Sequence, residues 1–118
     1  MDWICRRRIR RELERMRAIA SRIERYLKLE LELIGYVRRC RSNEELRPFK
    51  LRKNCIPLKG LNFCVDPSTK KVYVTFIDTD YRCYVISFLN DSYFKKFVER
   101  LCDLYSTSCL VYSFCSCS

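Results

Sequence analysis

The chain is 118 residues long, and its 24 Lys and Arg against 14 Asp and Glu give it a net charge of +10 at pH 7. This length bounds the chain to one domain, or to one domain with an arm, and its 48% of hydrophobic residues excludes an intrinsically disordered protein. No segment approaches 18 uninterrupted apolar residues, and the N-terminus lacks the apolar run of a signal peptide, so we expect no transmembrane helix. The expected location is intracellular, in the cytoplasm, with the host cell of a virus as one setting.

The first predicted element is one long helix over residues 6–40. Its apolar residues recur at spacings of four and three, a period of 3.5 that is typical of a coiled coil or a helix pair. At about 1.5 Å per residue such a helix spans roughly 50 Å, so one of its ends must project or meet a partner chain. The seam consists of Ile9, Leu13, Met16, Ala20, Ile23, Leu27, Ile34 and Val37.

An alternative for the second half of this segment is a strand. Leu27, Leu29, Leu31 and Leu33 alternate with charged residues, which is a period of two. Because Leu, Lys and Glu favour helices over strands, the sequence favours the helix, with Gly35 marking a bend near its end.

Beyond residue 60 the period changes to two. It predicts three strands in an antiparallel meander, followed by a helix whose N-cap signal is Asn90-Asp91-Ser92 and by a last strand. These elements are strands at 61–65, 72–77 and 82–89, a helix ending near residue 105 and a strand at 110–115. The predicted fold class is α+β in the order α-β-β-β-α-β. A basic arm of long helix and loop at 1–53 and a small α+β domain at 54–118 form one cooperative unit.

Both faces of the predicted meander are apolar. In its middle strand, Val74 and Phe76 lie on one side, whereas Tyr73 and Ile77 lie on the other. One short helix covers a single face, so the second must be covered by the long helix or by a second copy of the chain. We expect a homodimer, formed through the 9–37 helix seam or through the second sheet face.

The positive charge is concentrated in the first half of the chain. Residues 1–53 contain 17 Lys and Arg with 8 Asp and Glu, whereas residues 54–118 contain 7 and 6. Guanidinium groups match phosphate oxygens in pairs and do not lose their charge. We therefore predict a nucleic-acid-binding protein with a regulatory or packaging role, with DNA favoured over RNA. The predicted phosphate-binding residues are Arg6, Arg7, Arg8, Arg10, Arg11, Arg15, Arg17, Arg38, Arg39, Arg41, Lys50, Arg52 and Lys53.

Two other interpretations of the Arg-rich segment stay open. It is a solvated helix face if Glu12, Glu14 and Glu24 pair with Arg residues three or four positions away. It also suits an acidic protein or a membrane surface. The helix macrodipole disfavours Arg near a helix N-terminus, which favours an interpretation in which phosphates compensate.

Nine cysteines occur in a chain that has no His and no Gln. Few amides and much charge are typical of hyperthermophiles, whose intracellular proteins carry disulfides, so we expect an archaeal or viral protein from such a setting. No CxxC pair is present, so we expect at least one disulfide and no metal site. Buried free thiols are the alternative for Cys64, Cys83 and Cys102. The alternative function is a disulfide-stapled structural or assembly protein, such as a virion component.

A metal-dependent nuclease is the second alternative. Asp78 and Asp80 lie together at a strand end, with Lys95 and Lys96 later in the chain. Turn chemistry accounts for both Asp residues and no His is available as a base, so we expect no enzyme, no catalytic residue and no cofactor. The α-β-β-β-α order with this Lys pair resembles a double-stranded RNA-binding domain. The chain is not assigned to that family, because the first helix is far too long and the last strand is unmatched.

Overall fold

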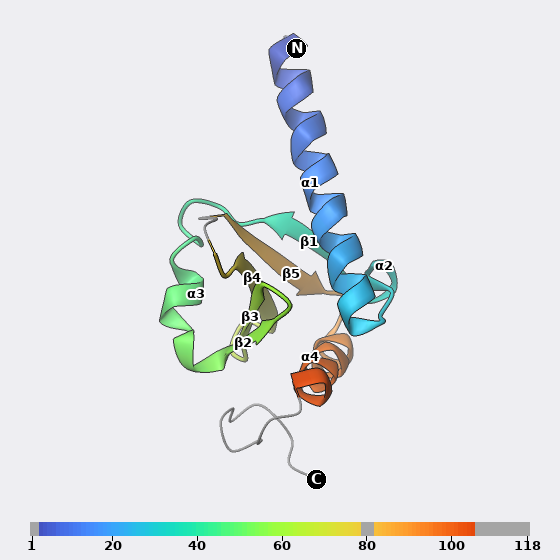
Figure 1. Cartoon of the computed structure of the whole chain (residues 1–118), viewed down its shortest axis with the longest axis vertical. Coiled ribbons are helices and arrows are strands. Elements are labelled where there is room, and N and C mark those ends of the chain that lie inside the picture. Colours follow the sequence, from blue (N-terminus) through green and yellow to red (C-terminus); the bar gives the residue numbers. More distant parts are fainter. Residues whose placement is uncertain (1–2, 79–81, 106–118) are drawn as a thin grey trace.

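A computed structural model describes residues 3–78 and 82–105 of the chain. A five-stranded antiparallel sheet has two helices packed on one face, and the N-terminal half of the first helix projects from the domain (Figure 1). The predicted α+β class is confirmed. No helix among these residues is both long and apolar enough to cross a membrane.

The strands follow the order β1-β5-β4-β3-β2 across the sheet, and every neighbouring pair is antiparallel. The predicted meander is confirmed as β3, β4 and β5, whereas the two outer strands were not predicted. The predicted strand at 110–115 lies outside the described residues. The elements are α1 (Trp3–Leu27), α2 (Leu31–Ile34), β1 (Gly35–Arg39), α3 (Arg47–Lys50), the 3-10 helix η1 (Arg52–Asn54), β2 (Cys55–Leu58), β3 (Leu61–Asp66), β4 (Lys71–Phe76), β5 (Cys83–Phe88) and α4 (Asp91–Tyr105).

The prediction of one helix over residues 6–40 is wrong beyond Leu27. Lys28 adopts a left-handed conformation with φ of 53°, which ends α1. Arg100, far away in the sequence, donates from Nε to the carbonyl of Leu27 at 2.8 Å and satisfies one of the carbonyls that the helix end leaves open. The chain then turns through α2 and returns as edge strand β1.

β1 pairs with β5 from Gly35 opposite Phe88 to Arg39 opposite Tyr84. A side chain at position 35 would place its Cβ 2.3 Å from the carbonyl oxygen of Ser87, so only glycine permits this approach of the two strands. The residue that the sequence suggested as a helix bend is therefore the start of a strand.

The first face of the sheet holds the main hydrophobic core. From α1, Ile23 and Leu27 are fully buried, and Phe97 and Leu101 from α4 are buried beside them. From residue 19 onwards the apolar side of α1 thus packs on the sheet of the same chain. The 9–37 seam as a whole is therefore not available for pairing with a second copy of the chain. Only its N-terminal members stay outside the core, with Ile9 48% exposed. In α4, Asn90 Oδ1 accepts from the Tyr93 backbone N–H at 3.0 Å, which confirms the predicted N-cap.

The second face is partly covered by residues 40–54 and carries two disulfides. Cys40 is bonded to Cys83, and Cys55 is bonded to Cys64 on the adjacent strand. The prediction of at least one disulfide is confirmed. The alternative of buried free thiols is wrong for Cys64 and Cys83, and also for Cys102, which is disulfide-bonded as well. Spacing along the chain did not reveal these pairs because the sheet brings the strands together.

An ion pair between a buried carboxylate and a partly exposed guanidinium fixes α3 to the second face. The Asp66 side chain is 2% exposed, and its Oδ2 accepts from Nε and Nη2 of Arg47 at 3.0 and 2.7 Å. Its Oδ1 accepts from Ser68 Oγ at 2.7 Å. Burial alone raises the pKa of Asp66, but hydrogen bonds from Ser68, Arg47 and Thr69 outweigh it and lower the pKa from 3.8 to about 2.

Asp66→Asn is expected to lower the free energy of unfolding by about 2 kcal/mol at pH 6, because it removes charged hydrogen bonds of a buried carboxylate. The folded-state pKa lies below the unfolded value. The carboxylate therefore stabilises the fold by about 2 kcal/mol above pH 4, and this contribution is lost as the pH falls towards 2. Urea unfolding at several pH values should show the gap between parent and variant narrowing in acid. The exposed Asp78→Asn is the control, and a gap that does not change with pH would contradict the assignment.

Candidate nucleic-acid interface

The projecting half of α1 carries most of the predicted phosphate-binding residues. From Cys5 to Ala18 no side chain is buried, and this segment spans about 21 Å at 1.5 Å per residue. Figure 1 shows it extending away from the sheet and from the other helices. The exposed arginines on it are Arg6, Arg7, Arg8, Arg10, Arg11, Arg15 and Arg17.

The arginines lie on both sides of an apolar stripe. Ile9 and Leu13, which are 48% and 43% exposed, continue the buried seam of α1 outwards. Residues four or seven positions apart share a side of a helix, so Arg10 and Arg17 lie beside this stripe on one side. Arg8 and Arg15 lie further round on the other side, beyond Glu12, and Arg7 and Arg11 lie on the side of the helix opposite the stripe. The projecting segment is therefore an apolar ridge between two rows of cations.

Few carboxylates compensate these cations. The first turn of α1 contains no acidic residue, so its positive dipole end adds to the Arg charges. Glu12 pairs with Arg15 at 3.8 Å and with Arg39 of β1 at 3.1 Å. Within the projecting segment from Cys5 to Ala18, five arginines make no hydrogen bond and no ion pair with another described residue: Arg6, Arg8, Arg10, Arg11 and Arg17.

The side chains of Arg38 and Arg39 in β1 are held by carboxylates. Arg38 donates from both terminal nitrogens to Glu44, each at 2.9 Å, and these bonds lower the pKa of Glu44. Arg39 donates from Nη1 to Glu12 at 3.1 Å, and the backbone N–H of Arg41 donates to Glu44 at 3.2 Å. These bonds close the loop after β1 and tie β1 to α1. Phosphate binding by these three arginines stays a prediction.

The last predicted group lies on another part of the molecule. Lys50, Arg52 and Lys53 are exposed on α3 and η1, which cover the second face of the sheet, whereas α1 packs on the first. Figure 1 shows α3 on the side of the sheet away from α1. The structure therefore does not join the predicted residues into one surface. It separates the projecting arginines of α1 from the cations of α3 and η1.

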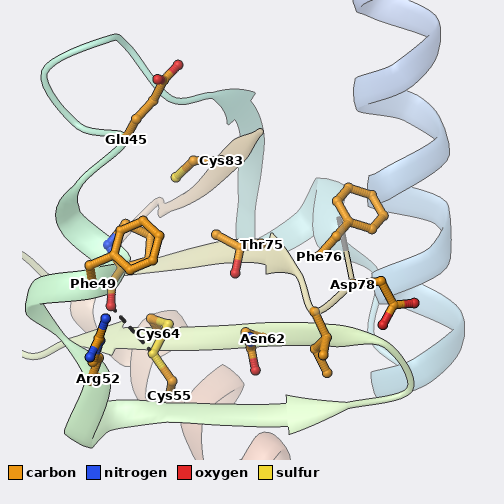
Figure 2. Close-up of a pocket in the computed structure, with 12 residues that line it drawn as sticks. Glu45, Phe49, Arg52, Cys55, Asn62, Cys64, Thr75, Phe76, Asp78 and Cys83 are labelled. Atoms are coloured by element: carbon orange, nitrogen blue, oxygen red, sulfur yellow. Dashed lines mark hydrogen bonds between the residues drawn. A yellow bond between two sulfur atoms is a disulfide. The ribbon is translucent and has the colours of Figure 1, made fainter. Parts of the chain in front are cut away.

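The part of the second face that residues 40–54 leave uncovered forms a pocket of about 400 Å³, here called the second-face pocket. Asn62 and Thr75, a directly opposed pair of β3 and β4, lie in its middle, with Phe49 and Arg52 along one side (Figure 2). Asp78 lies across from them. The sulfur of Cys55 lies 3.4 Å from the carbonyl oxygen of Leu51 and 3.7 Å from that of Pro48. These are contacts rather than hydrogen bonds, because a disulfide sulfur carries no hydrogen.

Sequence reasoning did not single out Asn62 and Thr75. A signal was present in the sequence, because each is a polar residue within a strand whose neighbouring residues are mostly apolar. Their importance became visible only when the sheet register placed them opposite each other beside Phe49.

The residues of the nuclease alternative are not brought together. Asp78 lies two residues beyond the last residue of β4, whereas Lys95 lines a pocket with Lys70, which precedes the first residue of β4. β4 is a strand of 6 residues, so it keeps Asp78 roughly 17 Å or more from the end of the sheet where Lys70 and Lys95 lie. Asp80 lies outside the described residues. No group of three His, Cys, Asp or Glu side chains among residues 3–78 and 82–105 is arranged to hold a metal ion.

Comparison with known proteins assigns no family to the chain. No protein-family model matches the chain, and no curated protein or solved structure shows significant similarity to it.

Proposed function

We propose that the protein binds duplex DNA by inserting the projecting half of α1 into the major groove. The observation that carries this proposal is the set of five exposed arginines on that segment without a hydrogen-bond or ion-pair partner among the described residues. A solvated face of a self-compensated helix is less consistent with this surface, because Glu12 is the one acid of the segment with a described ion pair. The regulatory or packaging role belongs to the same proposal.

The dimensions of the segment suit the major groove. An α-helix with its side chains is about 10–12 Å across, and the major groove of B-DNA is about 12 Å wide. A helix lying along the groove has a phosphate strand on each side, which matches the two rows of Arg. The ridge of Ile9 and Leu13 then faces the groove floor, where thymine methyl groups accept apolar contacts.

The same geometry favours DNA over RNA. The major groove of an A-form RNA duplex is deep and too narrow for side chains to read, so a helix with cations on both flanks does not fit it. Arg on two sides of a helix also favours the groove over a flat anionic membrane, which meets one side of a helix.

Binding is expected to depend steeply on salt. Four phosphate contacts, by Arg6, Arg8, Arg10 and Arg17, predict that affinity for duplex DNA falls about 150-fold between about 50 mM and about 200 mM salt, because each contact releases counterions. Arg11 is not counted because it lies opposite the ridge. Fluorescence anisotropy with a labelled duplex measures this slope. A duplex RNA of the same sequence is expected to bind more weakly, and equal binding of both would contradict the groove geometry.

Reversing two charges of α1 tests the site itself. Arg8→Glu with Arg10→Glu, one residue from each side of the ridge, is expected to reduce affinity for duplex DNA on the order of 50-fold at about 0.1 M salt and to reduce the salt slope by about 2. Lys95→Glu with Lys96→Glu, on exposed positions of α4, changes the net charge equally and is the matched control. An equal loss in both variants would mean that net charge, and not α1, governs binding.

A homodimer and an assembly role stay alternatives that the same samples test. The disulfides support a stapled protein, and Cys5 is an exposed free thiol near the tip of α1. Light scattering without nucleic acid gives the mass of the particle. Large oligomers that do not bind DNA would favour the assembly protein over DNA binding.

A further inference from the structure

We propose that the second-face pocket binds an unpaired nucleobase, with the base against Phe49 and its phosphate at Arg52. The pocket lies on the opposite face of the sheet from α1, and its residues take no part in the duplex site proposed above. This proposal therefore goes beyond duplex binding and stands on separate observations.

The pocket has an aromatic surface for a base to stack on. Phe49 is 61% exposed although it lies beside a buried face of the sheet. The Arg52 guanidinium lies 5.8 Å from the centre of the Phe49 ring. Aromatic rings and guanidinium planes are the two surfaces on which proteins stack unpaired bases.

Polar groups that can read a base edge lie in the middle of the pocket. Asn62 and Thr75 are half-buried, and neither side chain forms a hydrogen bond within the described part of the chain. The Asn amide offers a donor and an acceptor side by side, and the Thr hydroxyl offers both from one atom. These unused groups are those needed to pair with the edge of a base once water has been displaced.

The charges around the pocket match the two ends of a nucleotide. Lys50, Arg52 and Lys53 provide cations on the α3 and η1 side, where a phosphate would lie. Glu45 and Asp78 line other parts of the wall, and carboxylates accept hydrogen bonds from exocyclic amino groups. This distribution favours adenine or cytosine over thymine, which carries no amino group.

The frame of the pocket is rigid and of suitable size. Both disulfides contribute residues to its lining, so β2, β3, β5 and the loop before α3 are cross-linked around it. A volume of about 400 Å³ lies within the usual range of small-ligand sites. A base therefore enters a preformed site and little ordering of the protein opposes binding.

The test compares three probes by anisotropy or calorimetry: a single-stranded oligo(dA), a single-stranded oligo(dT) and a blunt DNA duplex. The parent protein is expected to bind oligo(dA) more tightly than oligo(dT). Phe49→Ala should weaken oligo(dA) binding about tenfold, and Phe49→Trp should restore it, because stacking is what the substitution removes. Duplex binding should be unchanged in both variants, whereas Arg8→Glu with Arg10→Glu should weaken duplex binding.

Two further measurements show whether the bound base belongs to a free nucleotide or to a strand, and whether the effect is specific to Phe49. Deoxyadenosine monophosphate shows whether the pocket takes a free nucleotide as well as a strand; loss of its binding in Phe49→Ala supports the site in either case. Leu46→Ala changes an exposed residue that precedes α3 and does not line the pocket, so it should bind as the parent does. Oligo(dA) binding that is unchanged by Phe49→Ala, or absent in the parent, would overturn the proposal without affecting the duplex site.

Discussion

Removing the disulfide between Cys40 and Cys83 is expected to lower the free energy of unfolding by about 4 kcal/mol. The two cysteines are 43 residues apart in sequence, and closing a loop of that length restricts the unfolded chain by about this amount in the chain-entropy description. The bond also joins the end of β1 to β5 under the loop that leads to α3. The variant to make is Cys40→Ala with Cys83→Ala, because alanine leaves no buried hydroxyl on this face.

Urea unfolding at pH 7 measures the effect, with two other variants for comparison. Cys5→Ala removes an exposed free thiol and should leave stability unchanged. Cys55→Ala with Cys64→Ala opens a loop of 9 residues and should cost about 2.5 kcal/mol. A loss for Cys40 and Cys83 no larger than that for the shorter loop would show that loop closure does not govern the stability of this fold.

Phe97→Ala is expected to be about as damaging, with a loss of about 4 kcal/mol. Phe97 is fully buried on α4, and its ring centre lies 5.2 Å from that of Phe88 and 6.3 Å from that of Phe63. Truncation therefore removes aromatic contacts to two strands and leaves a cavity where α4 meets the sheet.

The exposed Phe49→Ala provides the same chemical change as a control. It should alter stability by less than about 0.5 kcal/mol, because its ring is mostly in solvent. This result would also show that any loss of oligonucleotide binding in that variant is not caused by unfolding. Similar losses for the two Phe variants in urea unfolding would contradict the assignment of the core to the first face.

The two stability predictions concern opposite faces of one sheet. The sequence predicted the apolar character of both faces but not the segments that pack on each. The apolar alternation of 72–77 correctly indicated that both faces carry buried apolar residues, although the second face is only partly covered. It did not reveal that both helices pack on the first face, because the apolar pattern around Ile23 and Phe97 does not specify which side of the sheet they pack against. The second face is covered by residues 40–54, which have no long apolar pattern and contain only short elements.

The candidate duplex site was the more predictable of the two sites. The exposure of Arg8 and Arg11 follows from local sequence, since charged residues on a projecting helix have nothing to pack against. The second-face pocket depends on Phe49, Asn62 and Thr75, which lie in three separate elements. No local pattern joins these residues, because their distances are set by strand register.

The sequence by itself determined the α+β class, the central meander, the cap of α4 and the concentration of positive charge on a helix, since each depends on neighbours within a few residues. Only the tertiary structure decided where α1 ends, how the cysteines pair and which half of the second face stays open. Lys28 ends the helix in a left-handed conformation, and Arg100, 73 positions after Leu27, donates to the carbonyl of Leu27 at this helix end. Gly35 begins a strand because β5 lies against it. Contacts between distant segments override local helix propensity, and the periodicity of a sequence does not reveal such contacts.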